Sequence, residues 1–382
     1  MPDLLDTQLV HALQIDGRAP FSLIAEVLGV SDQTIARRYG RLRSAGMLRV
    51  RGLVEPDLIG LTSWLIRVQC TPSAASAVAE ALARRPETAW ISLTSGGTEI
   101  TCAVRTRTGA DDSHLLLDTL PRSPGVTAMT AQCVLHTFFG GVLSLINKGG
   151  SLTAGQVAAL RPAPAGRPPD RPLDRPGRLS AEDRLLLATL EMDGRTTFSD
   201  LAAATGWSQT TVRRRIADLR ASGTLYFDVD FHQSLLDLTV RAVLWLSVSP
   251  AQLSAAGEAL AGHPETAYVA ATTGPANLYA SVLSADTEAL YEYLTTRIAL
   301  LPGVNQVESI PVMRTIKRSG LLAAPERPVL APGRKAGPQA PERLRTDGAK
   351  LRPSATPGPG PGERPVLSAG TTAGCGEAIV TG

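Results

Sequence analysis

The residues best suited to chemistry in this chain form a basic, hydroxyl-bearing set that begins at Ser31 and recurs from Ser208. Arginine can pair with two acceptors of guanine at once, glutamine with adenine, and hydroxyl groups with phosphate oxygens. Proteins hold and read double-stranded DNA with these groups. The candidate DNA-binding residues are Ser31, Gln33, Thr34, Arg37, Arg38, Arg41 and Arg51 in the first set, and Ser208, Thr210, Thr211, Arg213, Arg214 and Arg215 in the second.

The two sets belong to two copies of one sequence unit. Residues 6–48 and 183–225 run in register without a gap, and the likeness continues after a slip of one residue. A unit of this length is too long for a solenoid repeat and long enough to bury a core of its own. The chain is therefore interpreted as a covalently fused pair of like units. The matching segments include Asp16-Gly17-Arg18 with Asp193-Gly194-Arg195, and residues 86–89 with residues 264–267.

Three helices are expected to position the candidate residues of each copy. Apolar spacing predicts first helices over residues 5–15 and 183–192, and shorter second helices over residues 22–28 and 199–205. Ser31 and Ser208 suit the start of a third helix, because a hydroxyl there accepts from an unpaired backbone N–H. Two helices, a four-residue turn and a third helix predict a helix-turn-helix. The stripes expected to be buried are Ile35, Tyr39 and Leu42, and Val212, Ile216 and Leu219.

The two copies differ where DNA would be touched. Asp218 takes the position of Arg41, and Asp228 that of Arg51 in an extended segment that resembles a wing. A carboxylate that faces phosphate weakens binding by charge repulsion. We therefore expect copy one to bind DNA more strongly than copy two, and the two halves of the operator need not be alike.

A different pattern follows each set of helices. From residue 62 the sequence alternates between apolar and polar residues, which predicts a strand, and the order strand, helix, two strands around a glycine turn, helix and strand follows. Helices are expected at about residues 112–120 and 286–300. This βαββαβ order predicts an α+β fold in which a ferredoxin-like sandwich follows each winged helix-turn-helix. The residues expected on one side of the first strand are Trp64, Ile66, Val68 and Cys70, matched in copy two by Ala242, Leu244, Leu246 and Val248.

These patterns divide the chain into six parts. The sheet of each ferredoxin-like domain leaves one face open, and the other copy is its expected partner. Pro, Arg, Gly and Ala dominate the two segments outside the repeat, which are interpreted as a linker and a disordered tail. The expected parts are the helix-turn-helix domains 1–60 and 180–237, the ferredoxin-like domains 61–148 and 238–320, the linker 149–179 and the tail 321–382.

Composition excludes several classes of protein. The formal net charge is +3 over 382 residues, which does not by itself indicate nucleic-acid binding. Asp3 and Asp6 do not suit the start of a signal peptide, and no run of about 20 apolar residues could cross a membrane, so we expect a cytoplasmic protein. No phosphate-binding loop or nucleophile set stands in the sequence, so hydrolytic and nucleotide-driven functions are not expected. We expect a protein that is not an enzyme and has no cofactor or metal. The cysteines lack a C-x-x-C pair: Cys70, Cys102, Cys133 and Cys375.

The combination resembles the Lrp/AsnC, or feast/famine, family of transcription regulators over nearly all of residues 4–148 and 180–318. The resemblance implies a helix-turn-helix that binds DNA and a sheet domain that dimerises and binds an amino acid or a related small molecule. Two fused units imply a pseudodimer within one chain that assembles into a higher homo-oligomer. The likeness lies in Leu5-Asp6, Asp16-Gly17-Arg18, residues 25–31, Arg37-Arg38, Leu42, Ala45-Gly46 and residues 57–60.

The same resemblance implies an effector site at a glycine turn that ends in an aspartate, roughly G-x-x-D. Neither copy keeps the aspartate, since Glu99 and Asn277 stand there. Glu99 could still pair with the ammonium group of a ligand, whereas Asn277 could accept only as a neutral group. A plain hairpin turn and a regulator that binds no effector stay open. The candidate effector-binding residues are Gly96, Gly97, Thr98, Glu99, Gly274, Pro275 and Asn277.

The rival interpretation is an enzyme, because siroheme decarboxylases are similar in architecture. Such an enzyme needs imidazole and cationic groups around the carboxylates of a tetrapyrrole, and it has no need of the arginines on the third helix. The sequence alone leaves open the regulated genes, the sign of regulation, the effector, and whether the copies pair within or between chains. The groups available to the enzyme are His114, His136 and His263, with Arg105, Arg107, Arg241 and Arg314.

Overall fold

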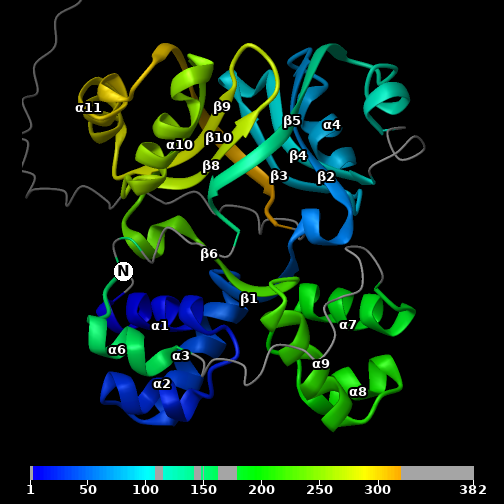
Figure 1. Ribbon diagram of the computed structural model, residues 1–382, viewed down its shortest axis with the longest axis vertical. Coiled ribbons are helices and arrows are strands. Elements are labelled where there is room, and N and C mark those ends of the chain that lie inside the picture. The colour runs from blue at the N-terminus through cyan, green and yellow to red at the C-terminus, as the bar shows by residue number, and fades with distance from the viewer. Residues whose placement is uncertain (1–2, 108–114, 142–147, 149, 162–178, 320–382) are drawn as a thin grey trace, which may run out of the picture. The chain divides into compact units, whose positions relative to one another are not determined.

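The computed structural model describes residues 3–107, 115–141, 148, 150–161 and 179–319 of the 382-residue chain (Figure 1). The expected tail 321–382 and most of the expected linker lie outside the described residues, as do His114 and Cys375. None of the helices in these ranges is long and apolar enough to cross a membrane.

Copy one begins with the helices α1 (Leu4–Ile15), α2 (Phe21–Leu28) and α3 (Asp32–Ser44). Gly29 ends α2 in the left-handed conformation, with a φ of +68°. The side chain of Ser31 then accepts a hydrogen bond from the backbone N–H of Thr34 and begins α3, which confirms its predicted role as the N-cap.

Copy two repeats this arrangement with α7 (Ala181–Met192), α8 (Phe198–Thr205) and α9 (Gln209–Ala221). Ser208 accepts from the N–H of Thr211, so its predicted role as a cap is confirmed as well. Both predicted apolar stripes are buried, and they belong to a single hydrophobic cluster that joins the two helix-turn-helices. Local sequence therefore sets the helices, and apolar burial unites the copies.

One helix was not expected. Residues Ala154–Leu160 form α6, which begins with a capping box between Thr153 and Gln156. Its Leu160 is 1% exposed, and Gln156 Nε2 donates to the carbonyl oxygen of Val27 at 3.1 Å. The interpretation of residues 149–179 as a plain spacer is thus wrong for this part, which packs on α1 and α2. The capping box was the signal in the sequence.

The expected wings pair with each other. The strands β1 (Leu48–Val54) and β6 (Leu225–Phe231) form a two-stranded antiparallel sheet in which Arg51 lies opposite Asp228. These two residues are equivalent in the repeat, so the register is symmetric about this pair. A lone strand leaves its backbone N–H and C=O groups unpaired, and the like strand of the other copy satisfies them. The pairing lies within one chain.

The predicted α+β class with a βαββαβ unit in each copy is confirmed. The elements of copy one are β2 (Leu61–Cys70), α4 (Ala75–Ala83), β3 (Thr88–Thr94), β4 (Glu99–Arg107) and β5 (Val126–Phe139). Those of copy two are β7 (Val240–Val248), α10 (Leu253–Gly262), β8 (Thr266–Thr272), β9 (Leu278–Ser284), α11 (Thr287–Thr296) and β10 (Val304–Lys317).

The strands of copy one lie in the order β3-β4-β2-β5, and those of copy two in the order β8-β9-β7-β10. At the position of α11 in copy one the structure describes a short π-helix over Leu115–Thr119. Short 3-10 segments span Pro56–Ile59, Ser95–Gly97, Gln233–Leu236, Pro250–Gln252 and Ile298–Leu300.

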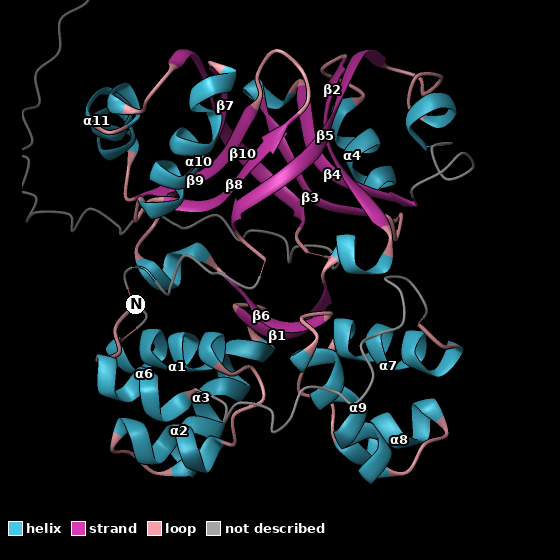
Figure 2. Cartoon of the chain, viewed as in Figure 1, coloured by secondary structure: helices cyan, strands magenta, loops and turns pink. Residues whose placement is uncertain are grey.

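Two long strands close both sheets into one barrel (Figure 2). β5 pairs with β2 of its own copy and then, from Val134, with β8 of the other copy. β10 pairs with β7 and then, from Val312, with β3. Each copy keeps its own core between sheet and helices, and a further cluster that includes Leu65, Trp245 and Tyr279 lies between the copies. The open face of each sheet is thus covered by the other copy, as expected.

Candidate nucleic-acid interface

The exposed face of α3 carries a row of hydrogen-bond donors. Gln33, Arg37 and Arg41 are exposed and stand four residues apart, so they lie on one side of the helix. Within the described part of the chain the guanidinium of Arg37 makes neither a hydrogen bond nor an ion pair. Arg37 is therefore free to pair with the acceptors of a nucleic acid.

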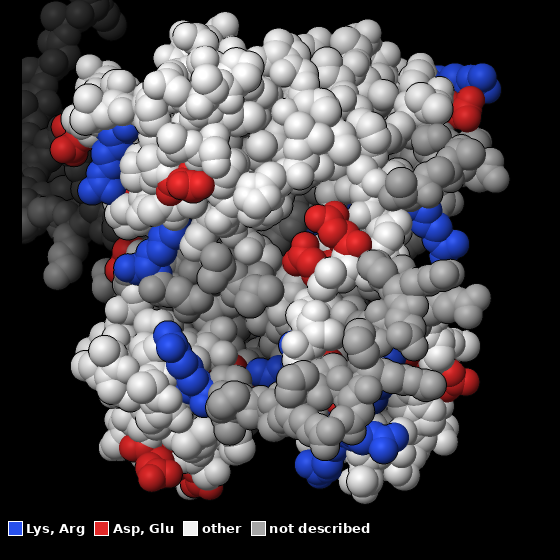
Figure 3. All heavy atoms as spheres, viewed as in Figure 1, with Lys and Arg blue, Asp and Glu red and all other residues white. Residues whose placement is uncertain are grey.

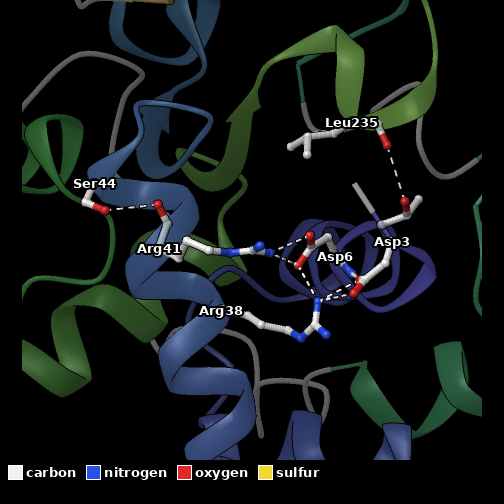
Figure 4. A network of polar contacts seen from close by, with 7 residues as sticks. Asp3, Asp6, Arg38, Arg41, Ser44 and Leu235 are labelled. Carbon is white, nitrogen blue, oxygen red and sulfur yellow. Dashed lines mark hydrogen bonds and ion pairs between the residues drawn. The ribbon is translucent and has the colours of Figure 1, made fainter. Parts of the chain in front are cut away.

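Two neighbouring arginines are held by the first helix. Arg38 Nη1 contacts Asp3 Oδ1 at 2.6 Å and Asp6 Oδ1 at 2.9 Å, and Arg41 Nη2 contacts Asp6 Oδ2 at 2.6 Å (Figure 4). The side chain of Asp6 is 3% exposed, whereas that of Arg41 is 59% exposed. The hydrogen bond from Arg38 lowers the pKa of Asp3. Arg38 thus links α3 to α1, while much of the side chain of Arg41 stays exposed to solvent. This role of Asp6 was not predicted from the sequence.

The equivalent network in copy two has a different charge pattern. Arg215 Nε and Nη2 donate to the two carboxylate oxygens of Asp183 at 2.6 and 2.7 Å. Asp218, in the position of Arg41, lines a hollow of about 390 Å³ between α9 and the start of α7. The side chain of Arg214 lines the same hollow and is exposed. The carboxylate of Asp218 therefore lies near Arg214, whereas Arg41 takes the equivalent position near Arg37.

The asymmetry concerns the position of charge and not its amount. The helices α3 and α9 have the same formal charge, since each carries four arginines and one aspartate. Asp32 begins α3, where its carboxylate interacts favourably with the positive end of the helix dipole. Asp218 lies further along α9, away from the start of the helix. Arg213 lies 3.9 Å from the ring centroid of Phe198, and Thr210 is exposed. The basic side chains on the surface of the second helix-turn-helix in Figure 3 are arginines, since residues 180–225 contain no lysine.

Arg51 is not a DNA contact, contrary to the sequence-based expectation. It is 1% exposed, its Nε donates to the carbonyl oxygen of Glu191 at 2.8 Å, and its Nη1 donates to Ser319 Oγ at 2.9 Å. A buried guanidinium cannot reach phosphate. The expectation that Asp228 repels DNA from a wing is wrong as well, because the carboxylate of Asp228 accepts hydrogen bonds from Gln14 and Val229 within the chain.

Burial raises the pKa of Asp228 to about 6. Gln14 Nε2 donates to its carboxylate at 3.1 Å and the N–H of Val229 at 2.9 Å, and both bonds oppose the rise. Asp230 adds to the rise, and Arg51 opposes it. The folded chain therefore holds a proton on Asp228 more readily than the unfolded chain does.

This shift makes stability depend on pH. Because the folded pKa lies above the ordinary value of 3.8, the protonated group favours folding below pH 4, and this contribution is lost as the pH rises through 6. We expect Asp228→Asn to raise the free energy of unfolding by about 1–3 kcal/mol at pH 8, with no gain at pH 4. Urea unfolding at both pH values measures this. Glu288→Gln, which removes an exposed carboxylate, is the control, and an equal gain at both pH values would contradict the assignment.

The first predicted effector turn is occupied by protein groups. Gly96 and Gly97 have φ values of +70° and +86°, which explains the glycines. Glu99 is 3% exposed, and its carboxylate accepts from Arg67 and, at 2.6 Å, from Ser95 Oγ. The other nitrogens of Arg67 donate to Glu308 of copy two at 2.7 and 2.8 Å. Glu99 therefore joins the two copies, and an effector would have to displace Arg67.

The second turn also has a structural role. Asn277 donates from Nδ2 to the carbonyl oxygen of Val248 at 2.9 Å and accepts from its N–H at 2.8 Å. Gly274 has a φ of +97°, and Pro275 is exposed beside it. In the first turn Thr98 Oγ1 donates to the carbonyl oxygen of Ser95 at 2.8 Å. The expected polar groups of both turns are thus engaged within the chain.

The groups named for an enzyme make separate contacts. His136 stacks edge-on against Phe138, and a ring nitrogen of His263 lies 3.0 Å from Tyr293 Oη. Arg241 donates to Ser281 Oγ at 3.1 Å. Among the described residues no cluster of His, Cys, Asp and Glu could hold a metal ion.

Comparisons with known proteins agree with this geometry. The model of the AsnC-type helix-turn-helix domain matches residues 3–43 and 179–220, and that of the Lrp/AsnC ligand binding domain matches residues 241–322. The HTH-type transcriptional regulator FL11 of Pyrococcus abyssi is 30% identical over 139 residues, which cover 35% of this chain and 90% of that protein. FL11 of Pyrococcus horikoshii is 28% identical over 137 residues, with coverages of 35% and 90%.

The siroheme decarboxylase NirDL has a similar fold, with a TM-score of 0.55 over 83% of this chain and 94% of that one. The sequences are 12% identical, so this likeness concerns the fold alone. The relatives named as regulators match at higher identity, and each of them corresponds to about one unit of the repeat. The chain therefore belongs to the Lrp/AsnC family of DNA-binding transcription regulators, with two of the family's units fused in one polypeptide.

Proposed function

We propose that the chain regulates transcription by placing α3 and α9 in the major groove of DNA. The observation that carries this proposal is the exposed, unpaired guanidinium of Arg37 on a capped third helix. A donor fork in that place suits guanine. Arg51 is no longer among the proposed contacts. Those that remain are Ser31, Gln33, Thr34, Arg37, Arg38 and Arg41 in copy one, and Ser208, Thr210, Thr211, Arg213, Arg214 and Arg215 in copy two.

The fused pair predicts the form of the operator. Two recognition helices in one pseudodimer suit two half-sites about one helical turn apart, roughly 34 Å. Asp218 cannot donate to guanine as Arg41 can, so the half-sites should differ in sequence. Selection of bound genomic fragments followed by footprinting tests this proposal. We expect two unlike protected blocks about one turn apart, and random fragments or a single block would contradict it.

A small-molecule effector is part of the proposal, because residues 241–322 match a ligand binding domain. The turns Gly96–Glu99 and Gly274–Asn277 are the proposed site, and binding of an ammonium group at Glu99 would require Arg67 to move away. Calorimetric titration with each amino acid tests this. We also propose that the chain acts in the cytoplasm and assembles into a higher homo-oligomer.

A tetrapyrrole-processing enzyme is the second candidate, and the fold shared with siroheme decarboxylase NirDL favours it. We favour the regulator without catalytic activity, because the relatives at 28–30% identity are named transcriptional regulators. Addition of siroheme to the protein distinguishes the two. A shifted absorbance band with release of carbon dioxide would support the enzyme, and an unchanged spectrum supports the regulator.

A further inference from the structure

The repeated tripeptide Asp-Gly-Arg lies where the two helix-turn-helices touch. Arg18, after α1, donates from Nη1 to the carbonyl oxygen of Gly194 at 2.7 Å and from Nη2 to that of Thr196 at 3.0 Å. Its guanidinium also lies 4.6 Å from the ring centroid of Phe198. A side chain of copy one thus holds the backbone of copy two at two points.

Arg195 makes the reciprocal contacts. Its Nη1 donates to the carbonyl oxygen of Gly17 at 2.8 Å, and its Nη2 donates to that of Ala19 at 3.0 Å. It lies 4.3 Å from the ring centroid of Phe21. Both arginines are half-buried, and none of these four hydrogen bonds involves a group that faces DNA in the proposed function.

The aspartates of the tripeptides reach the recognition helices of the opposite copies. Asp193 Oδ2 accepts from Arg43, in the last turn of α3, at 2.6 Å. Asp16 Oδ1 accepts from Arg220, in the last turn of α9, at 3.2 Å. Each recognition helix is therefore fastened directly to the other copy.

The glycines bring both loops against the β1–β6 pair. A Cβ at Gly17 would lie 2.7 Å from Phe227 Cβ, and one at Gly194 would lie 2.9 Å from the backbone of Arg51. The N–H of Gly194 donates to the carbonyl oxygen of Val50 at 2.9 Å. Side chains are excluded at both positions, so the loops and the strand pair form one packed layer.

We propose that the loops Asp16–Arg18 and Asp193–Arg195 form a reciprocal clasp that sets the distance and angle between α3 and α9, and thereby selects the spacing of the DNA half-sites. The proposal rests on the proposed function. Arg18 and Arg195 act as positioning residues, since their guanidiniums are engaged by backbone carbonyl oxygens of the other copy. With both loops in contact, the two recognition helices fit DNA half-sites at one spacing. Without these contacts the helices can move relative to each other and fit half-sites at several spacings.

The test uses the full chain and three duplexes: one with the selected spacing, one with half a helical turn inserted between the half-sites, and one with a single half-site. For the parent protein, insertion should weaken binding by about 100-fold or more, because bivalent binding is lost when the geometry forbids it. For the double variant Arg18→Gln, Arg195→Gln the insertion should weaken binding by less than about tenfold. The affinity of this variant for the single half-site should differ from that of the parent protein by less than about threefold.

The double variant Arg18→Lys, Arg195→Lys keeps both charges but replaces the planar fork, in which two nitrogens each donate to their own carbonyl oxygen, with a single ammonium nitrogen. The ratio of its affinities for the selected and the extended spacing should lie between those of the parent protein and the glutamine variant. If the glutamine variant does not fold, the lysine variant replaces it in the test. An unchanged spacing ratio in either folded double variant overturns the clasp. Absence of half-site binding by the parent protein would instead overturn the proposed function, so the two failures are distinguishable.

Discussion

Asp6→Ala is expected to lower the free energy of unfolding by about 2–3 kcal/mol. The carboxylate of Asp6 is buried and shared by Arg38 and Arg41, so its removal leaves Arg41 without a carboxylate partner and Arg38 with Asp3 alone. Loss of one partner of a fully buried ion pair costs about 3–5 kcal/mol, and exposure of Arg41 reduces this figure. Unfolding in urea measures the effect.

Glu26→Ala is the matched control for Asp6→Ala, because it removes an exposed carboxylate from the same helix-turn-helix. The control should change the free energy of unfolding by less than about 0.5 kcal/mol. Asp6→Asn, which keeps one acceptor oxygen on α1 but removes the charge, should lie between the two. If Asp6→Ala costs no more than Glu26→Ala, the network does not join α1 to α3 in solution.

Arg37→Ala is expected to weaken operator binding by about 5–150-fold, the effect of losing one bidentate base contact of about 1–3 kcal/mol. Arg214→Ala, at the equivalent position of α9, should weaken it less than about fivefold, because Asp218 lies beside Arg214 and opposes its contact with DNA. Arg215 is a poorer comparison, since it holds Asp183. Fluorescence anisotropy with the selected operator measures both affinities.

Asp218→Arg is the converse of this test, since it gives copy two the residue of copy one. Asp218→Arg should increase the affinity for the operator. In a chain that carries Asp218→Arg, the further change Arg214→Ala should lower this affinity more than it does in the parent protein. Equal losses for Arg37→Ala and Arg214→Ala in the parent protein would contradict the asymmetry between the copies.

The local elements were predictable because local residues determine them. Ser31 caps α3, Gly29 ends α2, and the buried stripe of α3 follows from helical spacing. The same reasoning recovered the strands, whose alternation identifies an inner face. The helix α6 was missed because it is short and precedes a run of Pro and Arg, so its capping box was the single available signal.

The partners of charged residues were less predictable, because distant segments supply them. Arg51 looks like a basic residue on a wing, and its burial depends on Glu191 and Ser319. Glu99 looks like a ligand carboxylate, and its partner Arg67 is bound in turn by Glu308 of the other copy. Periodicity can place such side chains on a face but cannot identify the groups that meet them there.

DNA binding through α3 is tested most directly by titration of the chain with its selected operator at several salt concentrations. We predict binding with a Kd below about 10⁻⁷ M, a steep fall in affinity with salt, and collapse of sequence preference in the double variant Arg37→Ala, Arg41→Ala. Binding that is absent, or that is weak and indifferent to both DNA sequence and this variant, would contradict the claim.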